Sequence, residues 1–184
     1  ERNRTSEEGS LSKILFYDIA RQTRRSAGIS LGDADNCYDR IAHAIASLVF
    51  RAFGVSKAAT GAMLKTIQEM KFFLQTGFGD STDFASSKLE IKTQGLCQGN
   101  GAAPAGWAVV SICIIKVHKR KGHGAHFICP ITKLTSHIAG IIYVDDTDLI
   151  HFRMDEDQGK EEAFFHLQEA ITNWGRLLIA SGGA

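Results

Sequence analysis

The segment 141–150 concentrates carboxylates between two apolar runs. Asp145, Asp146 and Asp148 fall within four positions, and the flanking residues are apolar enough to form two buried strands. Carboxylates this close repel one another and lose hydration unless a cation lies among them. Mg²⁺ prefers oxygen ligands and is usually held by one or two carboxylates together with substrate phosphates. The segment therefore predicts a hairpin whose tip takes part in metal-dependent phosphoryl or nucleotidyl transfer.

Asp33 is a second acidic candidate. Residues 27–32 alternate between apolar and polar side chains and predict a short strand that delivers Asp33 at its end. Carboxylates from separate strands can hold two metal ions about 4 Å apart, which activate the attacking hydroxyl and stabilise the leaving phosphate. An Asp at this position can equally cap the next helix. Asp39 lies in the first turns of that helix, where it is expected to pair with Arg40 or Arg51 or to complement the helix dipole.

The segment 94–104 is a loop of small residues with three glycines, and Pro104 suits the opening of the helix beyond it. Glycines let a backbone approach a base or a sugar closely, and a helix N-terminus can accept negative charge. A plain connection between a loop and a helix would explain this composition as well.

The composition indicates one domain with a real core, because 184 residues include 44% hydrophobic and 9% aromatic side chains. The 21 Lys and Arg nearly cancel the 20 Asp and Glu, so the net charge of +1 excludes a global attraction for nucleic acid. Any contact with a polyanion must be local. The basic residues cluster in two places, at Arg21, Arg24 and Arg25, and at Lys116, Lys119, Arg120 and Lys121 beside His118 and His123. The second cluster either meets a nucleic-acid backbone or is a solvated helix end.

The four cysteines are far apart, and no secretory signal or long apolar span is visible. This pattern predicts an intracellular protein, in the nucleus or the cytoplasm, with no membrane partner. His123, His126 and Cys129 have a spacing that could suggest zinc, but a fourth ligand is lacking.

The remaining pattern predicts an α+β domain in which helices back an antiparallel sheet, with the acidic residues on the open face of that sheet. Helices are expected over 11–24, from residue 36 to 54, through Met63, Ile67, Met70 and Leu74, over 105–119 and over 163–178. Strands are expected over 72–78 and, after a polar turn over 79–88, over 89–92. Trp107 and Trp174 are expected in the core.

Three segments, 33–41, 98–104 and 143–146, resemble the palm motifs of reverse transcriptases in the same order. The similarity is greatest to enzymes of the non-LTR retrotransposon and group II intron type. The resemblance implies a polymerase palm over 33–184 that ends before a thumb, and a partial fingers region with a connecting helix and the first strand over 1–32. It also implies that the chain belongs to a longer polyprotein or retroelement protein with other domains.

The resemblance carries over to the acidic residues one by one. Asp33, Asp145 and Asp146 match the catalytic aspartates that bind two Mg²⁺ ions, with Mn²⁺ as a possible substitute, and the carbonyl of Ala34 would also reach a metal. The implied reaction is that of an RNA-directed DNA polymerase, which adds deoxynucleoside triphosphates to the 3′ end of a DNA or RNA primer on an RNA template.

The resemblance also assigns residues to the nucleotide. Tyr38 matches the aromatic side chain that lies under the incoming sugar and blocks a ribose 2′-hydroxyl. Gln98 and Gly99 match the motif that contacts the template and the incoming nucleotide. One alternative is an inactive polymerase-like domain that serves as a nucleic-acid or protein-binding scaffold. Another is an RNA-dependent RNA polymerase, which Tyr38 disfavours.

Overall fold

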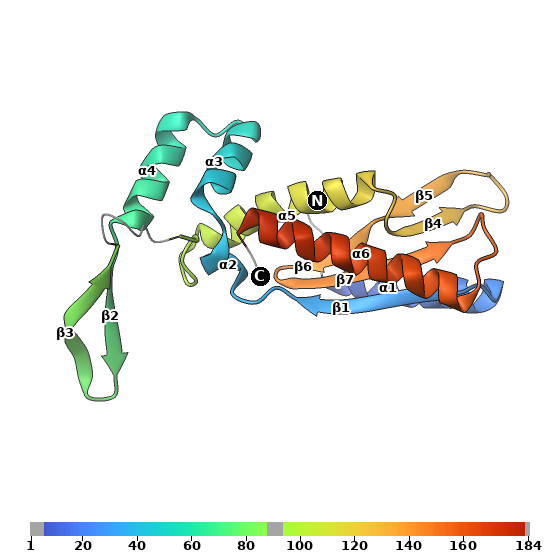
Figure 1. The fold of residues 1–184 in the computed structure, drawn as a ribbon, viewed down its shortest axis with the longest axis horizontal. Helices are drawn as coiled ribbons and strands as arrows, with labels where there is room; N and C mark the ends of the chain where they lie inside the picture. Colours follow the sequence, from blue (N-terminus) through green and yellow to red (C-terminus); the bar gives the residue numbers. More distant parts are fainter. Residues whose placement is uncertain (1–5, 88–93, 183–184) are drawn as a thin grey trace. The chain divides into compact units, whose positions relative to one another are not determined.

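The computed structural model describes residues 6–87 and 94–182 (Figure 1). These residues form two compact units: unit 1 contains 6–35 and 112–180, and unit 2 contains 36–87, 94–111 and 181–182. The first division between the units, after residue 35, follows the strand β1 (Ala27–Asp33), and the expected division into fingers over 1–32 and palm over 33–184 stays a prediction.

Unit 1 is built on a five-stranded sheet with β7 (Asp146–Arg153) at its centre. Both β1 and β6 (Gly140–Tyr143) pair with β7 in antiparallel fashion. The strand β4 (Ala125–Ile128) pairs antiparallel with β5 (Thr135–Ile138) but parallel with β7. The expectation of a purely antiparallel sheet is therefore wrong at this one ladder. Because β5 and β6 follow one another in the same direction, only two reversals separate β4 from β7, and the two strands run the same way.

Helices cover both faces of this sheet. One face carries α1 (Ser6–Thr23), whose Phe16 ring meets Phe152 of β7 edge-on at 6.1 Å between centroids. The α+β class is confirmed, but the expectation that the acidic residues lie on an open face is corrected. Asp146, Asp148 and Phe152 share a face by strand alternation, so α1 lies on the acidic side of the sheet.

The opposite face carries α6 (Lys160–Ser181) and the second half of α5 (Ala103–Arg120). A side chain at Gly28 would lie 2.8 Å from Leu167 of α6, so the glycine is what lets this helix approach β1. The buried residues of α6 repeat every three or four positions, as its sequence pattern predicts. The apolar ones are Ala163, Leu167, Ala170 and Trp174.

Unit 2 contains three helices before the hairpin, α2 (Cys37–Arg40), α3 (His43–Ala52) and α4 (Lys57–Gln68). The single helix expected from residue 36 to 54 is wrong, because the chain becomes extended at Ile41 and Ala42. The backbone groups here form tertiary hydrogen bonds: Ala42 N–H donates to Ser181 O, and Ile41 O accepts from Gly95 N–H. The positions of the buried side chains change at this break in the helix.

The buried side chains of this stretch are Cys37, Ile41, Ala46 and Phe50, whereas Leu48 is 62% exposed. The helix expected to reach Leu74 ends at Gln68, so neither Met70 nor Leu74 is helical. Trp107 is buried in unit 2 and Trp174 in unit 1, as expected for core residues.

The hairpin of unit 2 consists of β2 (Lys71–Thr76) and β3 (Gly79–Ser86). Most of the expected polar turn over 79–88 is therefore strand, because Gly77 and Phe78 alone make the reversal. The hydroxyl of Thr76 stabilises this turn by donating to Gly79 O and accepting from Phe78 N–H. The strand expected over 89–92 lies outside the described residues.

His118 of α5 is fully buried and does not belong to the exposed basic end where the sequence placed it. Its Nδ1 pairs with Asn173 Nδ2 of α6 at 3.1 Å, and its ring meets Trp174 edge-on. Its Nε2 has no hydrogen-bond partner among the described residues. Burial, with the nearby His123 and His137 adding a smaller effect, lowers the pKa of His118 to about 4.

We expect acid to destabilise unit 1 through this histidine. Because the folded-state pKa lies below the ordinary value of 6.5, the unfolded chain binds the proton first. The contribution is complete above about pH 6.5 and is lost as the pH falls toward 4, by roughly 3 kcal/mol at full protonation. Thermal unfolding of wild type and His118→Gln between pH 7.5 and 4.5 should show a smaller pH dependence in the variant. His166→Gln, at a half-exposed histidine, is the control, and equal slopes in all three proteins would contradict the assignment.

Candidate functional site: two aspartates on adjacent strands

The pairing of β1 with β7 brings Asp33 and Asp146 opposite one another at the end of the ladder. Side chains directly opposite in an antiparallel pair have Cβ atoms about 4.5–5.5 Å apart. Beyond the ladder, Ala34 N–H donates to Asp145 O at 3.2 Å. The structure thus brings Asp33, Ala34, Asp145 and Asp146 together. Asp33 does not cap a helix, because Asn36 occupies the N-cap position of α2.

A tight turn of two residues, Val144 and Asp145, joins β6 to β7. Val144 has a φ of 57° and is the only one of the two with a positive φ, which is the pattern of a type II′ turn. That position normally carries glycine, and a β-branched residue there is strained. Strained backbone concentrates at functional sites. The turn leaves Asp146 exposed and Asp145 half-buried at the tip.

An open hollow of about 360 Å³ lies beside the paired aspartates. Its lining residues come from α1, β1 and β7 and are Lys13, Leu31, Gly32, Asp33, Asp146 and Asp148. Asp148 is only 8% exposed, and its carboxylate pairs with the Lys13 ammonium at 2.6 Å. Among the described residues, no Lys or Arg lies within ion-pair distance of Asp33 or Asp146. The structure therefore neutralises Asp148 and leaves Asp33 and Asp146 exposed without an ion-pair partner among the described residues.

The donor atoms at this end of the sheet suit a hard cation. In the part of the chain that the structure describes, no group of three or more His, Cys, Asp or Glu side chains is arranged to hold a metal. Asp33 and Asp146 instead present two exposed carboxylates on one sheet face, with Asp145 at the adjoining turn. Mg²⁺ commonly takes one or two carboxylates and completes its shell with water and substrate phosphates. The residues present fit a metal of that kind.

The residues expected to contact the nucleotide belong to unit 2. Asp39 Oδ1 accepts a hydrogen bond of 2.7 Å from Gln98 N–H, and Leu96 N–H donates to Tyr38 O at 2.6 Å. These bonds hold the loop of Gln98 and Gly99 against α2, the helix that carries Tyr38. This contact gives the Asp39 carboxylate a partner that the sequence did not suggest. No local sequence signal could have revealed it, because its partners are 59 positions apart.

The backbone of this loop packs closely against the backbone of α2, which holds the loop in position. Gly95 has a φ of 82°, and a side chain there would collide with the backbone of Asp39. Its carbonyl lies 2.6 Å from His43 Nε2, while Gln68 Nε2 lies 2.9 Å from His43 Nδ1. Since the amide of Gln68 donates, Nδ1 accepts and Nε2–H donates to Gly95 O. The imidazole therefore bridges α4 and the loop in one tautomer.

Comparison with known proteins adds no assignment. The chain matches no model of a known protein family and no curated protein. Within residues 6–87 and 94–182, no helix has the length and apolar character needed to cross a membrane. The function is therefore inferred from the geometry of the site and from the motifs.

We expect Lys13→Met to destabilise unit 1, because it leaves the buried carboxylate of Asp148 without its countercharge. The loss in the free energy of unfolding should be about 1–3 kcal/mol, less than for a fully buried pair because Lys13 is partly exposed. The double variant Lys13→Met/Asp148→Asn should recover most of it in urea unfolding. The matched control on α1 is Arg21→Met, which breaks the exposed pair with Asp18 and should cost less than about 0.5 kcal/mol. Equal losses in the two single variants would contradict this role.

Proposed function

We propose that this chain is the palm of an RNA-directed DNA polymerase, which extends a DNA or RNA primer on an RNA template with deoxynucleoside triphosphates. The observation that carries the proposal is the pairing of Asp33 with Asp146 at the end of the β1–β7 ladder. It joins two segments whose motifs resemble those of reverse transcriptases and that are remote in the sequence. Among the described residues these two exposed carboxylates form no ion pair with Lys or Arg, and such an arrangement is suited to holding metal ions.

The proposed chemistry assigns a role to each residue around the turn. Asp33, Asp145 and Asp146, with the carbonyl of Ala34, would hold two Mg²⁺ ions. When bound, these ions would lower the barrier to attack by the primer 3′-hydroxyl and to departure of pyrophosphate. Lys13 keeps Asp148 engaged, so that this carboxylate does not compete for the cations.

In unit 2 the contact between Asp39 and Gln98 supports a role in binding the nucleotide. It fixes the backbone of the loop at Gln98 and Gly99 to the helix of Tyr38, so the residues proposed to meet the incoming nucleotide and template are ordered together. Such ordering before binding reduces the entropy lost when the nucleotide enters.

We expect Asp33→Asn and Asp145→Asn each to reduce primer extension by at least about a hundredfold, because a lost metal ligand removes several kcal/mol of transition-state stabilisation. The measurement is incorporation of deoxynucleotide on an RNA template by the full-length protein that contains this chain, with Mg²⁺ or Mn²⁺. Asp157→Asn is the matched control, since Asp157 is exposed beyond the far end of β7.

Two outcomes would contradict the proposal. Extension at the wild-type rate by Asp145→Asn would show that the aspartates do not take part in the reaction. If the wild-type protein neither extends a primer nor binds deoxynucleotide in the presence of Mg²⁺, the scaffold function would replace the enzymatic one.

We expect Tyr38→Val to admit ribonucleotides, because the smaller side chain leaves room for the 2′-hydroxyl. Discrimination, taken as the ratio of kcat/KM for a deoxynucleotide to that for the matching ribonucleotide, should fall at least about tenfold. Tyr38→Phe, which keeps the ring, should retain it. An unchanged ratio in Tyr38→Val would contradict the role of this side chain and reopen the RNA polymerase alternative.

A further inference from the structure

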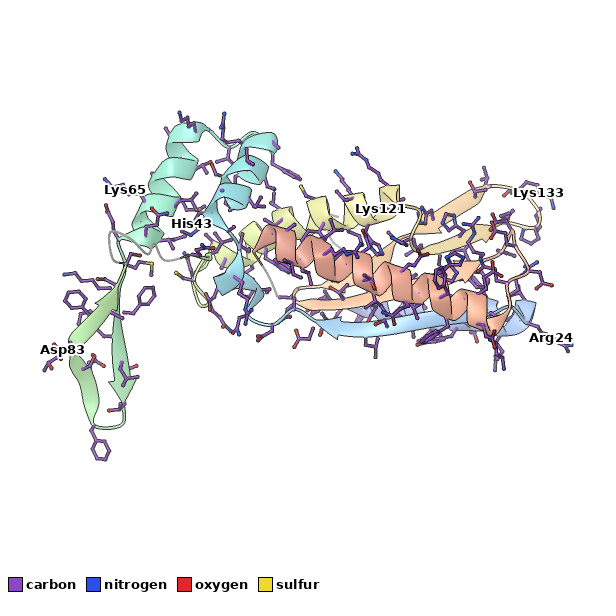
Figure 2. All side chains as sticks on the ribbon, in the orientation of Figure 1. Arg24, His43, Lys65, Asp83, Lys121 and Lys133 are labelled. Atoms are coloured by element: carbon purple, nitrogen blue, oxygen red, sulfur yellow. The ribbon has the colours of Figure 1, made fainter. Side chains whose placement is uncertain are left out.

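The end of α5 carries a concentration of exposed positive charge that the proposed reaction does not use. Three cations lie in its last turns, Lys121 follows the helix directly, and a fifth cation lies at the tip of the β4–β5 hairpin; Lys121 and Lys133 are labelled in Figure 2. We refer to the five exposed residues together as the basic surface. They are Lys116, Lys119, Arg120, Lys121 and Lys133.

The helix end and the hairpin are joined by direct contacts. Lys119 Nζ donates to His137 O of β5 at 3.2 Å, and the ring of His137 bonds to His123 O at 2.9 Å. The ring of His137 also stacks on His126 of β4, with centroids 3.9 Å apart. The cations of α5 and the hairpin therefore lie on one connected part of unit 1.

The charge of this surface is not compensated. No Asp or Glu occurs between Glu90 and Asp145 in the sequence. Among the described residues, none of the five cations forms an ion pair with a carboxylate. By contrast, Lys13 pairs with Asp148, and Arg153 pairs with both Asp155 and Glu156. The dipole at a helix C-terminus amounts to about half a negative charge, which is too little to balance four cations in two turns.

The basic surface lies away from the paired aspartates. Ile115 of α5 packs near Gly140, on the sheet face opposite α1, whereas Asp146 lies on the α1 face. Along β7, β4 pairs at Phe152, six residues from Asp146, which corresponds to about 20 Å. That length equals roughly six stacked base pairs. A polyanion on this surface is therefore not the segment that reacts at the aspartates.

We infer that the basic surface binds the phosphate backbone of RNA outside the reaction site and so holds the template to the palm. This inference rests on the proposed function, which makes RNA the polyanion that the chain meets. Ile131 and Leu134 flank Lys133 and are 88% and 72% exposed, so an anionic membrane is the competing partner that the test includes.

The test measures binding of the 184-residue chain to a fluorescent 20-nucleotide RNA by anisotropy, in EDTA and at several KCl concentrations. The variant Lys116→Gln/Arg120→Gln/Lys121→Gln should bind more weakly. Its slope of log K against log salt should be smaller by about 2–3, since each lost phosphate contact removes about 0.7–0.9. The matched control, Arg21→Gln/Lys160→Gln/Arg176→Gln, removes three exposed cations of unit 1 elsewhere and should keep the wild-type slope.

Three results would overturn the inference: an equal slope in the wild type and the basic-surface variant, an equal loss in the control, or tighter binding of a DNA duplex or of phosphatidylserine vesicles than of RNA. Because EDTA removes divalent metal, this test does not depend on the aspartates. Asp145→Asn should bind the RNA like the wild type even though it fails in primer extension. Failure of the binding test would therefore leave the proposed polymerase function standing, and failure of primer extension would leave the binding result standing.

Discussion

The antiparallel pairing of β1 with β7 is the constraint on which the candidate site depends. It runs without interruption from Ala27 and Phe152 to Asp33 and Asp146, so the last rung of the ladder determines that two carboxylates face each other. Farther along the ladder, Ile150 and Phe152 of β7 are buried in one core cluster with Phe16 and Ala20 of α1. A slip of one residue would move every β7 side chain to the other face and separate the acidic pair. The same strand register is thus required for packing of the core and for the geometry of the site.

The carboxylates of one short segment differ in burial and therefore in role. Asp148 is enclosed and neutralised by Lys13, whereas Asp146, two positions earlier on the same face, remains exposed. The basic surface is separated from them, toward the far end of the sheet and on its other face. This distribution lets a chain with a net charge of +1 present both the proposed cation site and the proposed polyanion surface.

The predictions that succeeded from sequence were those governed by local periodicity. The helices at α1 and α6 and the strand that ends at Asp33 follow from spacing alone. The failures occurred where distant backbone groups intervened. The helix expected after residue 36 breaks because Ile41 and Ala42 bond to Gly95 and Ser181. His118 has the sequence context of an exposed basic end, yet it is buried because α6 supplies Asn173 and Trp174 as neighbours.

The residue types and their order along the chain determined the candidate chemistry: an acidic turn between apolar strands, an aspartate at a strand end, and a glycine loop that opens a helix. Only the tertiary structure decided which of these groups meet. It paired Asp33 with Asp146 across two strands. It also formed the ion pair between Asp148 and Lys13 and the hydrogen bond between Asp39 and the backbone of Gln98. The physical reason is that periodicity records only which side of an element is buried, whereas a contact between remote residues depends on strand register and on packing of the whole unit.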